Sequence, residues 1–271
     1  MRLGIWTMLL TLATSVAAVD RASALIVAAD DASHHTYDGV WDTTDNGGTG
    51  FNSWSFIGRD NGSGFGGGFI ASGGAVSIGS GGSNEAFAVY GNNTGVGAAV
   101  RPFSVPLSVG WTFSIDMDNQ GIDPGGTVGF GLRNAAGNNL AEFFFVGGQS
   151  NYTVNGLSGT VSGSTPGFTT GGLKLSFLLT SANSFTMSID QLSNGPGVDN
   201  TVTGNLLSNA DQTIRNLRLF NANGGPDVFF NNFAISVVPE ASSMVFGCLV
   251  CCLIGVSLFV RKLHRKAPTS R

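Results

Sequence analysis

Three aspartates within one short segment have a spacing that could support chemistry. Asp116 and Asp118 lie two residues apart, and Asp123 follows a glycine turn. Carboxylate and amide oxygens are the ligands that Ca²⁺ prefers. The segment begins as an EF-hand loop does, but Gln120 stands at its fifth position and Thr127 at its twelfth, where such a loop has a glutamate. The segment therefore predicts Ca²⁺ as a candidate cofactor at Asp116, Asp118 and Asp123, with an ordinary acidic turn as the alternative.

Paired carboxyl groups are the second chemistry to consider. Glycosidases need two carboxyl groups that face each other across a groove. Asp116 and Asp118 have the spacing of such a pair on one wet face of a strand, although any half-buried strand produces the same two-residue repeat. Glu85 and Glu142 are the only glutamates between residues 25 and 238. We expect no enzyme, with a glycan-cleaving module as the alternative.

Nucleophilic catalysis lacks its usual side chains in the same region. The only histidines between residues 25 and 237 are His34 and His35, which as neighbours on an extended segment are expected to point to opposite faces. All three cysteines lie in the apolar run 244–260, so residues 25–237 contain neither a cysteine nucleophile nor a disulfide. The chain has no G-x-S-x-G nucleophile motif.

Exposed aromatic side chains could form a platform for sugar rings. The candidates are Trp41, Trp54, Tyr90 and Trp111. Because large aromatic side chains are highly buried on average, packing in a core is the expectation for each of them.

The elements that must position these residues are predicted to be β-strands. The chain contains 41 glycines, with many Asn, Ser and Thr, which favour turns and disfavour helices. Apolar runs of strand character recur between these turns, at 54–57, 75–78, 86–90, 100–105, 111–117, 127–132, 140–146, 152–154, 173–180, 184–189, 201–206, 214–220 and 228–237. This pattern predicts an all-β fold, an antiparallel β-sandwich of the jelly-roll kind, over residues 25–237.

Alternation of apolar and polar residues supports the strand prediction. In 111–118 every odd position is apolar and every even position polar, as in a strand with one buried face. Residues 173–177 and 185–189 repeat the pattern and are joined by 180–183, which predicts a hairpin. The glycine-rich stretch 62–82 has no phosphate-loop motif and is expected to be a flexible loop or short edge strands.

The first 24 residues have the features of a secretory signal peptide. Arg2 provides a positive start, residues 3–19 are mostly apolar, and Ala22-Ser23-Ala24 is a small-residue cleavage site. Cleavage after Ala18 is the alternative. We therefore expect residues 1–24 to direct export.

The C-terminal segment 238–271 has three parts in order. Val238-Pro239-Glu240 opens a short motif over 238–243, an apolar run covers 244–260, and the basic segment 261–271 contains Arg261, Lys262, Arg265 and Lys266. The run is at the short limit for a spanning helix, and the basic residues after it place the C-terminus in the cytoplasm by the positive-inside rule. The sequence thus predicts a single-pass membrane protein whose body lies outside the cytoplasm.

Charge separates the body from this tail. Residues 25–240 contain six basic and 16 acidic side chains, whereas residues 261–271 contain five basic and no acidic ones. An acidic body offers no surface for the phosphate backbone of nucleic acids, so we expect no nucleic-acid partner.

The order of motif, apolar helix and basic plug resembles the PEP-CTERM sorting signal of bacterial exopolysaccharide producers. In that family the motif is usually Pro-Glu-Pro, and here Ala241 replaces the second proline. The resemblance implies an exosortase-like processing enzyme as a partner, with Val238, Pro239 and Glu240 as the sorting motif. It also implies release to the cell surface or the extracellular matrix.

The body is similar to domains often found with such tails, and segment 227–233 is similar to the closing strand of concanavalin A-like jelly rolls. That family brings no assigned activity. From resemblance and composition together we expect a non-catalytic structural or adhesive protein of an exopolysaccharide layer, with a glycan-binding module as the alternative.

Overall fold

The computed structural model describes residues 24–238, apart from 39, 59–64, 74–76, 81, 83, 93 and 157–161. Residues 1–23 of the predicted signal peptide, the apolar run 244–260 and the basic segment 261–271 lie outside the described residues. Among the helices that are described, none has the length and apolar character needed to cross a membrane. Residues Ile26–Val237 form one unit of the chain.

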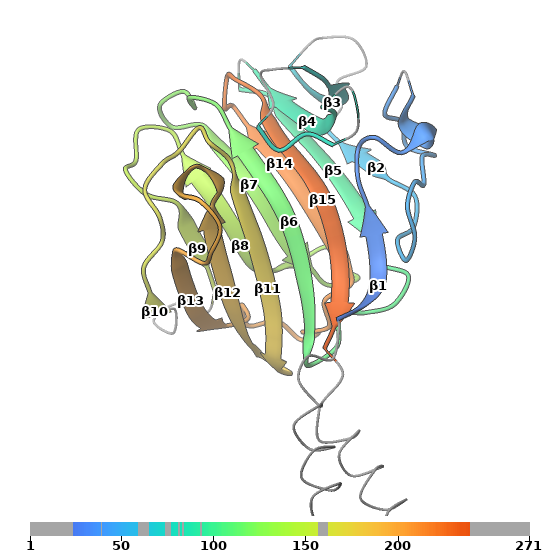
Figure 1. Cartoon of the computed structure of the whole chain (residues 1–271), viewed down its shortest axis with the longest axis vertical. Helices are drawn as coiled ribbons and strands as arrows, with labels where there is room; N and C mark the ends of the chain where they lie inside the picture. Colours follow the sequence, from blue (N-terminus) through green and yellow to red (C-terminus); the bar gives the residue numbers. More distant parts are fainter. Residues whose placement is uncertain are drawn as a thin grey trace, which may run out of the picture. The chain divides into compact units, whose positions relative to one another are not determined.

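Nine strands form the first sheet. In Figure 1, β12, β11, β6, β15 and β1 run side by side, and the first and last strands of the domain, β1 and β15, are neighbours. The order across the sheet is β10 (Ser162–Gly163), β13 (Asn200–Asn205), β12 (Ser184–Gln191), β11 (Leu173–Ser181), β6 (Trp111–Asn119), β15 (Val228–Val237), β4 (Ala86–Gly91) and β3 (Gly66–Ala71), with β1 (Leu25–Asp30) paired to β15.

Six strands form the second sheet, in the order β2 (Ser55–Ile57), β5 (Val96–Pro102), β14 (Asn216–Ala222), β7 (Thr127–Arg133), β8 (Asn139–Val146) and β9 (Thr153–Asn155). Successive strands from β4 to β7 alternate between the two sheets, as in jelly-roll sandwiches. Helical structure among the described residues is limited to two single 3₁₀ turns, η1 (His35–Tyr37) and η2 (Leu192–Asn194). The predicted all-β antiparallel sandwich is confirmed.

The core lies between the two sheets and is built by the alternation seen in the sequence. Phe113, Ile115 and Met117 of β6 are buried, and they pair with Phe177, Leu175 and Leu173 of β11 on the same face. Burial of each such side chain contributes about 1.5–3 kcal/mol. Aromatic rings fill much of this core, which contains no cysteine.

Two local predictions need correction. The run 75–78 was expected to be a strand, but Ser77 and Ile78 lie in a turn, where Ile78 packs with Ala71 and Phe229 in a small second apolar cluster. His34 and His35 were expected on opposite faces, but the 3₁₀ turn η1 brings their ring centroids to 4.3 Å. Within the glycine-rich stretch, β3 is an edge strand, one of the two alternatives expected there.

Candidate functional site

A depression lined by Thr127, Glu142, Phe144, Arg218, Phe220 and Ala222 lies on the outer face of the six-stranded sheet, above two buried glycines of β7. Val128, Phe130 and Leu132 of β7 point into the core, so Gly129 and Gly131 between them face outward. The depression has a volume of about 210 Å³. Because β7 has a neighbour on both sides, each glycine is flanked by two outward side chains.

The registers define these flanking pairs. Gly131 is opposite Arg218 on β14 and Glu142 on β8. Gly129 is opposite Phe220 on β14 and Phe144 on β8. Directly paired residues in antiparallel strands project to the same face, so a charged row and an aromatic row lie side by side. We call this the glycine groove, formed by Gly129, Gly131, Glu142, Phe144, Arg218 and Phe220.

The two glycines are present for different physical reasons. A Cβ atom on Gly129 would lie 2.2 Å from the carbonyl oxygen of Phe143 and 2.7 Å from Cβ of Phe144, so the strand packing itself requires glycine there. A Cβ atom on Gly131 would meet Cγ of Glu142 at 3.4 Å, an ordinary contact. The fold therefore tolerates a side chain at position 131, and such a side chain would project between Arg218 and Glu142 on the outer face.

Two arginines interact electrostatically with the carboxylate of Glu142, namely Arg218 in the charged row and Arg133, two residues beyond Gly131 on the same face of β7. The guanidinium carbon of Arg218 lies 4.8 Å from the ring centroid of Phe220. Burial lowers the pKa of Arg218, and the nearby charge of Arg133 lowers it further, while Glu142 raises it. Burial also lowers the pKa of Arg133. Arginine remains charged in proteins, so Arg218 in the groove and Arg133 beside it are both cations.

The carboxylate of Glu142 is held by two amides. Its Oε1 accepts a hydrogen bond from Nδ2 of Asn139, and its Oε2 accepts one from Nδ2 of Asn155 at 3.2 Å. Two buried polar atoms beside it, Nε of Arg133 and Oδ1 of Asn139, have no hydrogen-bond partner among the described residues. Buried polar groups are normally satisfied, so these two atoms are exceptions within the described part of the chain.

The outer face of the nine-stranded sheet carries a different charge pattern. Lys174 of β11 is opposite Asp116 of β6 and Asp190 of β12, beside a depression of about 190 Å³. Burial raises the pKa of Asp116, and a hydrogen bond from Asn232 and the charge of Lys174 oppose this. Lys174 thus lies between the carboxyl groups of Asp116 and Asp190.

The three aspartates predicted to bind calcium have separate partners. Asp116 accepts a hydrogen bond from Asn232 at 2.7 Å, whereas Asp118 accepts two from Ser77, from its backbone N at 3.1 Å and its Oγ at 2.7 Å. Asp123 lies in the loop after β6, where its backbone N donates to the carbonyl oxygen of Gly224.

Within the described ranges no group of three or more His, Cys, Asp or Glu side chains is positioned to hold a metal ion. Asp116 and Asp118 do lie on one strand, as predicted. Alternate residues of a strand are about 6.5 Å apart. The turn that contains Ser77 also covers Asp118. These side chains do not come together as the expected common site of Asp116, Asp118 and Asp123.

Asp116 and Asp118, the candidate carboxyl pair, lie on one face of β6 and are hydrogen-bonded by Asn232 and Ser77 respectively, and no described glutamate faces them from the other sheet. Asp116 faces outward from the nine-stranded sheet and Glu142 from the six-stranded sheet, with the core between them. Packed sheets are about 10 Å apart, so these two groups do not face each other across a groove. Opposite Glu142, across Gly131, stands Arg218 instead.

The aromatic candidates divide between core and surface. Trp41 and Trp54 are buried with ring centroids 4.9 Å apart, which confirms packing for both. Trp111 is half-buried and packs against the core, and Tyr90 is half-buried beside Phe69. The half-buried aromatic at the groove, Phe144, was not among the candidates.

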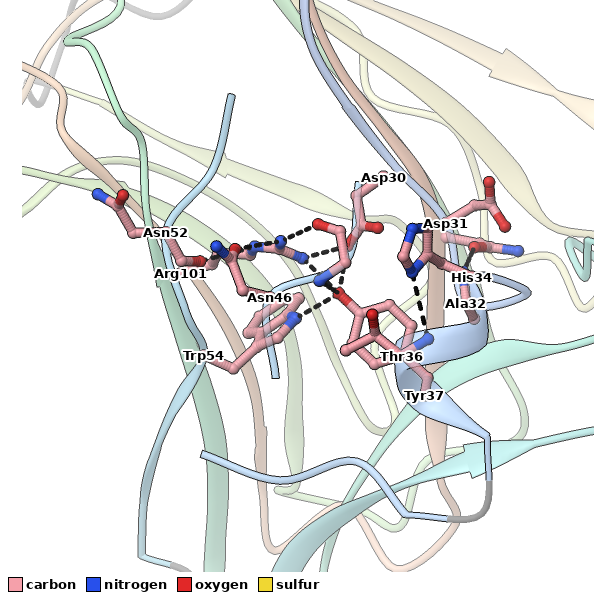
Figure 2. Close-up of polar contacts among 12 residues, drawn as sticks. Asp30, Asp31, Ala32, His34, Thr36, Tyr37, Asn46, Asn52, Trp54 and Arg101 are labelled. Carbon is pink, nitrogen blue, oxygen red and sulfur yellow. Dashed lines mark hydrogen bonds and ion pairs between the residues drawn. The ribbon is translucent and has the colours of Figure 1, made fainter. Parts of the chain in front are cut away.

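A buried charge cluster within the core was not predicted from the sequence. Figure 2 shows Arg101 of β5 reaching Asp30 of β1, and its Nη1 also donates to the hydroxyl of Tyr37 at 2.8 Å. The guanidinium carbon lies over the rings of Phe51 and Trp54, at 5.0 and 4.9 Å from their centroids. The sequence did contain one indication of this cluster. Arg101 is two residues from Ala99 on β5, so both side chains point into the core.

The terminal sorting residues are largely outside the described region. Val238, directly after β15, is exposed. Pro239, Glu240, Arg261, Lys262, Arg265 and Lys266 are not among the described residues.

No family model matches this sequence, and no curated protein matches it. Among solved structures, the chain is similar to the globular domain of T. cruzi calreticulin, with 11% identity and a TM-score of 0.45, covering 67% of this chain and 82% of that one. It is also similar to the cellulose induced protein Cip1, with 13% identity, a TM-score of 0.44 and coverage of 76% and 95%. The exoplasmic/lumenal domain of VIP36, in a form bound to Ca²⁺ and Man3GlcNAc, has 6% identity, a TM-score of 0.40 and coverage of 69% and 83%. Likenesses of this size identify neither a ligand nor an activity.

Proposed function

We propose that the protein is an exported, membrane-tethered, polysaccharide-binding protein of the cell surface or extracellular matrix, with an adhesive and non-catalytic role. The observation that carries this proposal is the glycine groove. Its two walls, on β14 and β8, are separated by two strand spacings, or about 9.5 Å between backbones, with only glycine between them. An elongated ligand with both polar edges and an apolar face fits this arrangement of a charged row beside an aromatic row.

The opposing groups at the groove favour binding over cleavage. Hydrolysis of a glycosidic bond uses two carboxyl groups on either side of the bond. In the glycine groove Glu142 faces Arg218 across Gly131, and its carboxylate is fixed by Asn139 and Asn155. This set can orient hydroxyl and acidic groups, which is the requirement of an adhesive surface.

In this proposal the N-terminal and C-terminal segments determine the location of the protein. Residues 1–24 direct export, and the apolar run 244–260 with Arg261, Lys262, Arg265 and Lys266 tethers the chain with its C-terminus inside. An exosortase-like enzyme then recognises Val238, Pro239 and Glu240 and releases the body to the surface or matrix. The sequence of these segments is the support for this part.

A groove-filling variant tests the binding function. The full chain, purified in detergent, is run in native gels that contain neutral or acidic polysaccharides, and retardation measures affinity. Gly131→Val places a side chain on the groove floor at a position where a Cβ atom fits, and β-branched residues suit strands. We expect the variant to melt as the wild type does and to lose retardation.

Lys174→Gln is the matched control, because it alters the outer face of the other sheet. Retardation that is equal in wild type and Gly131→Val, or absent for every polysaccharide with the wild type, would overturn the proposal. The release of reducing ends, measured in the same samples, tests the non-catalytic part, and a sustained release by the wild type would contradict it.

A further inference from the structure

The basic side chains of the described domain differ in how many carboxylates surround them. Of its five described basic side chains, Arg101 is paired with Asp30 in the core, and Lys174 lies between two carboxylates. Arg215 interacts with Asp211, whose pKa is lowered chiefly by hydrogen bonds from Thr213 and also by this arginine. The remaining two, Arg133 and Arg218, share the single carboxylate of Glu142.

The glycine groove is therefore a place of excess positive charge on an acidic body. Between residues 25 and 240 the sequence has 16 acidic and six basic side chains. An acidic body repels polyanions over most of its surface. The two neighbouring arginines at the groove make a local positive region, which attracts negatively charged groups. A ligand that complements the groove carries negative charge where it meets the charged row.

We infer that the glycine groove binds a carboxylate-bearing sugar, a uronic acid unit of an acidic polysaccharide, with Arg218 and Arg133 as the partners of its carboxylate. This inference rests on the proposed polysaccharide-binding function and names the substrate class of the same site. The planar guanidinium fork matches a carboxylate with two parallel hydrogen bonds, which makes arginine better suited to this group than lysine.

Phe220 positions the first of these arginines. Its ring is almost fully buried and lies 4.8 Å from the guanidinium carbon of Arg218, a distance at which ring and cation attract. The interaction restrains the long side chain before a ligand arrives, which lowers the entropy cost of binding. Phe144, half-buried on the opposite wall of the same row, leaves part of its ring for the apolar face of a sugar.

Glu142 and its amides complete the recognition of hydroxyl groups. Both carboxylate oxygens already accept hydrogen bonds from Asn139 and Asn155, which holds the group against the β8 wall. Nε of Arg133 and Oδ1 of Asn139 are buried without partners among the described residues, so the accessible polar groups of the groove are the Glu142 carboxylate and the outward arginine side chains. A uronic acid presents hydroxyl groups to the carboxylate and its own carboxylate to the arginines.

A carboxyl-reduced polymer is the sharpest test. Binding of the full chain in detergent to polygalacturonate is compared with binding to the same polymer after its carboxyl groups are reduced to alcohols. We expect reduction to weaken binding about tenfold or more, since hydrogen bonds to charged groups are lost. We expect Arg218→Gln to weaken polygalacturonate binding by a similar factor and to leave any binding of the reduced polymer unchanged.

Controls separate this inference from the proposed function. Lys174→Gln removes a cation from the other sheet and is expected to bind as the wild type does. Equal binding of native and reduced polymer would overturn the uronic acid inference and leave polysaccharide binding intact. Binding of polygalacturonate that survives Arg218→Gln combined with Arg133→Gln would also overturn it. Failure to bind either polymer or any neutral polysaccharide would overturn both.

Discussion

Arg101 of β5 and Asp30 of β1 form an ion pair inside the sandwich, with both side chains fully buried. Burial raises the pKa of Asp30, and the charge of Arg101 opposes that rise. The pair connects the first strand of the domain, which lies at the edge beside β15, to the second sheet. Tyr37 joins it, since its hydroxyl donates to Oδ2 of Asp30 at 2.6 Å.

A double-mutant cycle tests what this ion pair contributes. Arg101→Met leaves Asp30 buried without its partner and is expected to lower the free energy of unfolding by about 3–5 kcal/mol. Asp30→Asn combined with Arg101→Met removes the isolated charge, so we expect the double variant to be more stable than Arg101→Met alone. Urea unfolding of the four proteins measures this. A double variant as unstable as the sum of the singles would contradict a direct coupling between the two side chains.

The two glycines of the groove predict opposite effects of one substitution. Gly129→Ala pushes a methyl group against the backbone of β8 and is expected to cost about 1–3 kcal/mol or more. Gly131→Ala meets only ordinary contacts and is expected to stabilise by about 0.4–1 kcal/mol, because it reduces the freedom of the unfolded chain. Thermal melting of both variants decides between them. A loss of stability at position 131 as large as at position 129 would show that the floor of the groove is required by the fold.

Strand patterns predicted the core but not the groove. The alternation of β6 identified Phe113, Ile115 and Met117 as buried, because the period of a strand fixes which side chains share a face. The pairing of β7 with β14 and β8 joins residues that are distant in the chain, and no local pattern specifies which strands become neighbours. Gly129 and Gly131 lie within the predicted strand 127–132, but only the pairing with β14 and β8 determines which side chains flank them.

The buried carboxyl group of Asp118 is expected to make the stability of the folded protein depend on pH. Burial raises its pKa above the value in the unfolded chain, despite the two hydrogen bonds from Ser77. The folded state then binds a proton more readily than the unfolded state, so stability is greatest below the unfolded pKa and falls as pH rises through the folded pKa. Asp118→Asn keeps an acceptor for Ser77 and removes the charge.

We expect Asp118→Asn to gain stability relative to the wild type as the pH is raised from about 4 to 8, where the wild type bears the buried charge. The difference between the two melting temperatures over this range is the measurement. Asp199→Asn, at an exposed carboxylate, is the control for a general effect of charge removal. A constant difference between wild type and Asp118→Asn across the range would contradict the proposed cause.

The separate partners of Asp116, Asp118 and Asp123 predict little effect of calcium on stability. A ligand that binds only the folded state raises the melting temperature in proportion to its occupancy. We expect equal midpoints with Ca²⁺ and with a chelator. A midpoint that rises with Ca²⁺ and no longer rises in Asp123→Asn would restore the calcium site expected from the sequence.

The sorting motif predicts a separation of anchoring from processing. Val238, directly after β15, is exposed, so the deletion of Val238–Glu240 begins outside the core. We expect the deleted chain to stay in the membrane fraction through the run 244–260 while its C-terminus is no longer cut, because anchoring needs the apolar helix and processing needs the motif. Mass spectrometry of the C-terminus, with fractionation of the producing cells, measures both. Ala241→Pro restores the Pro-Glu-Pro form and is expected to be processed at least as fully as the wild type. A deletion variant with the same mature C-terminus as the wild type would contradict the role of Val238, Pro239 and Glu240.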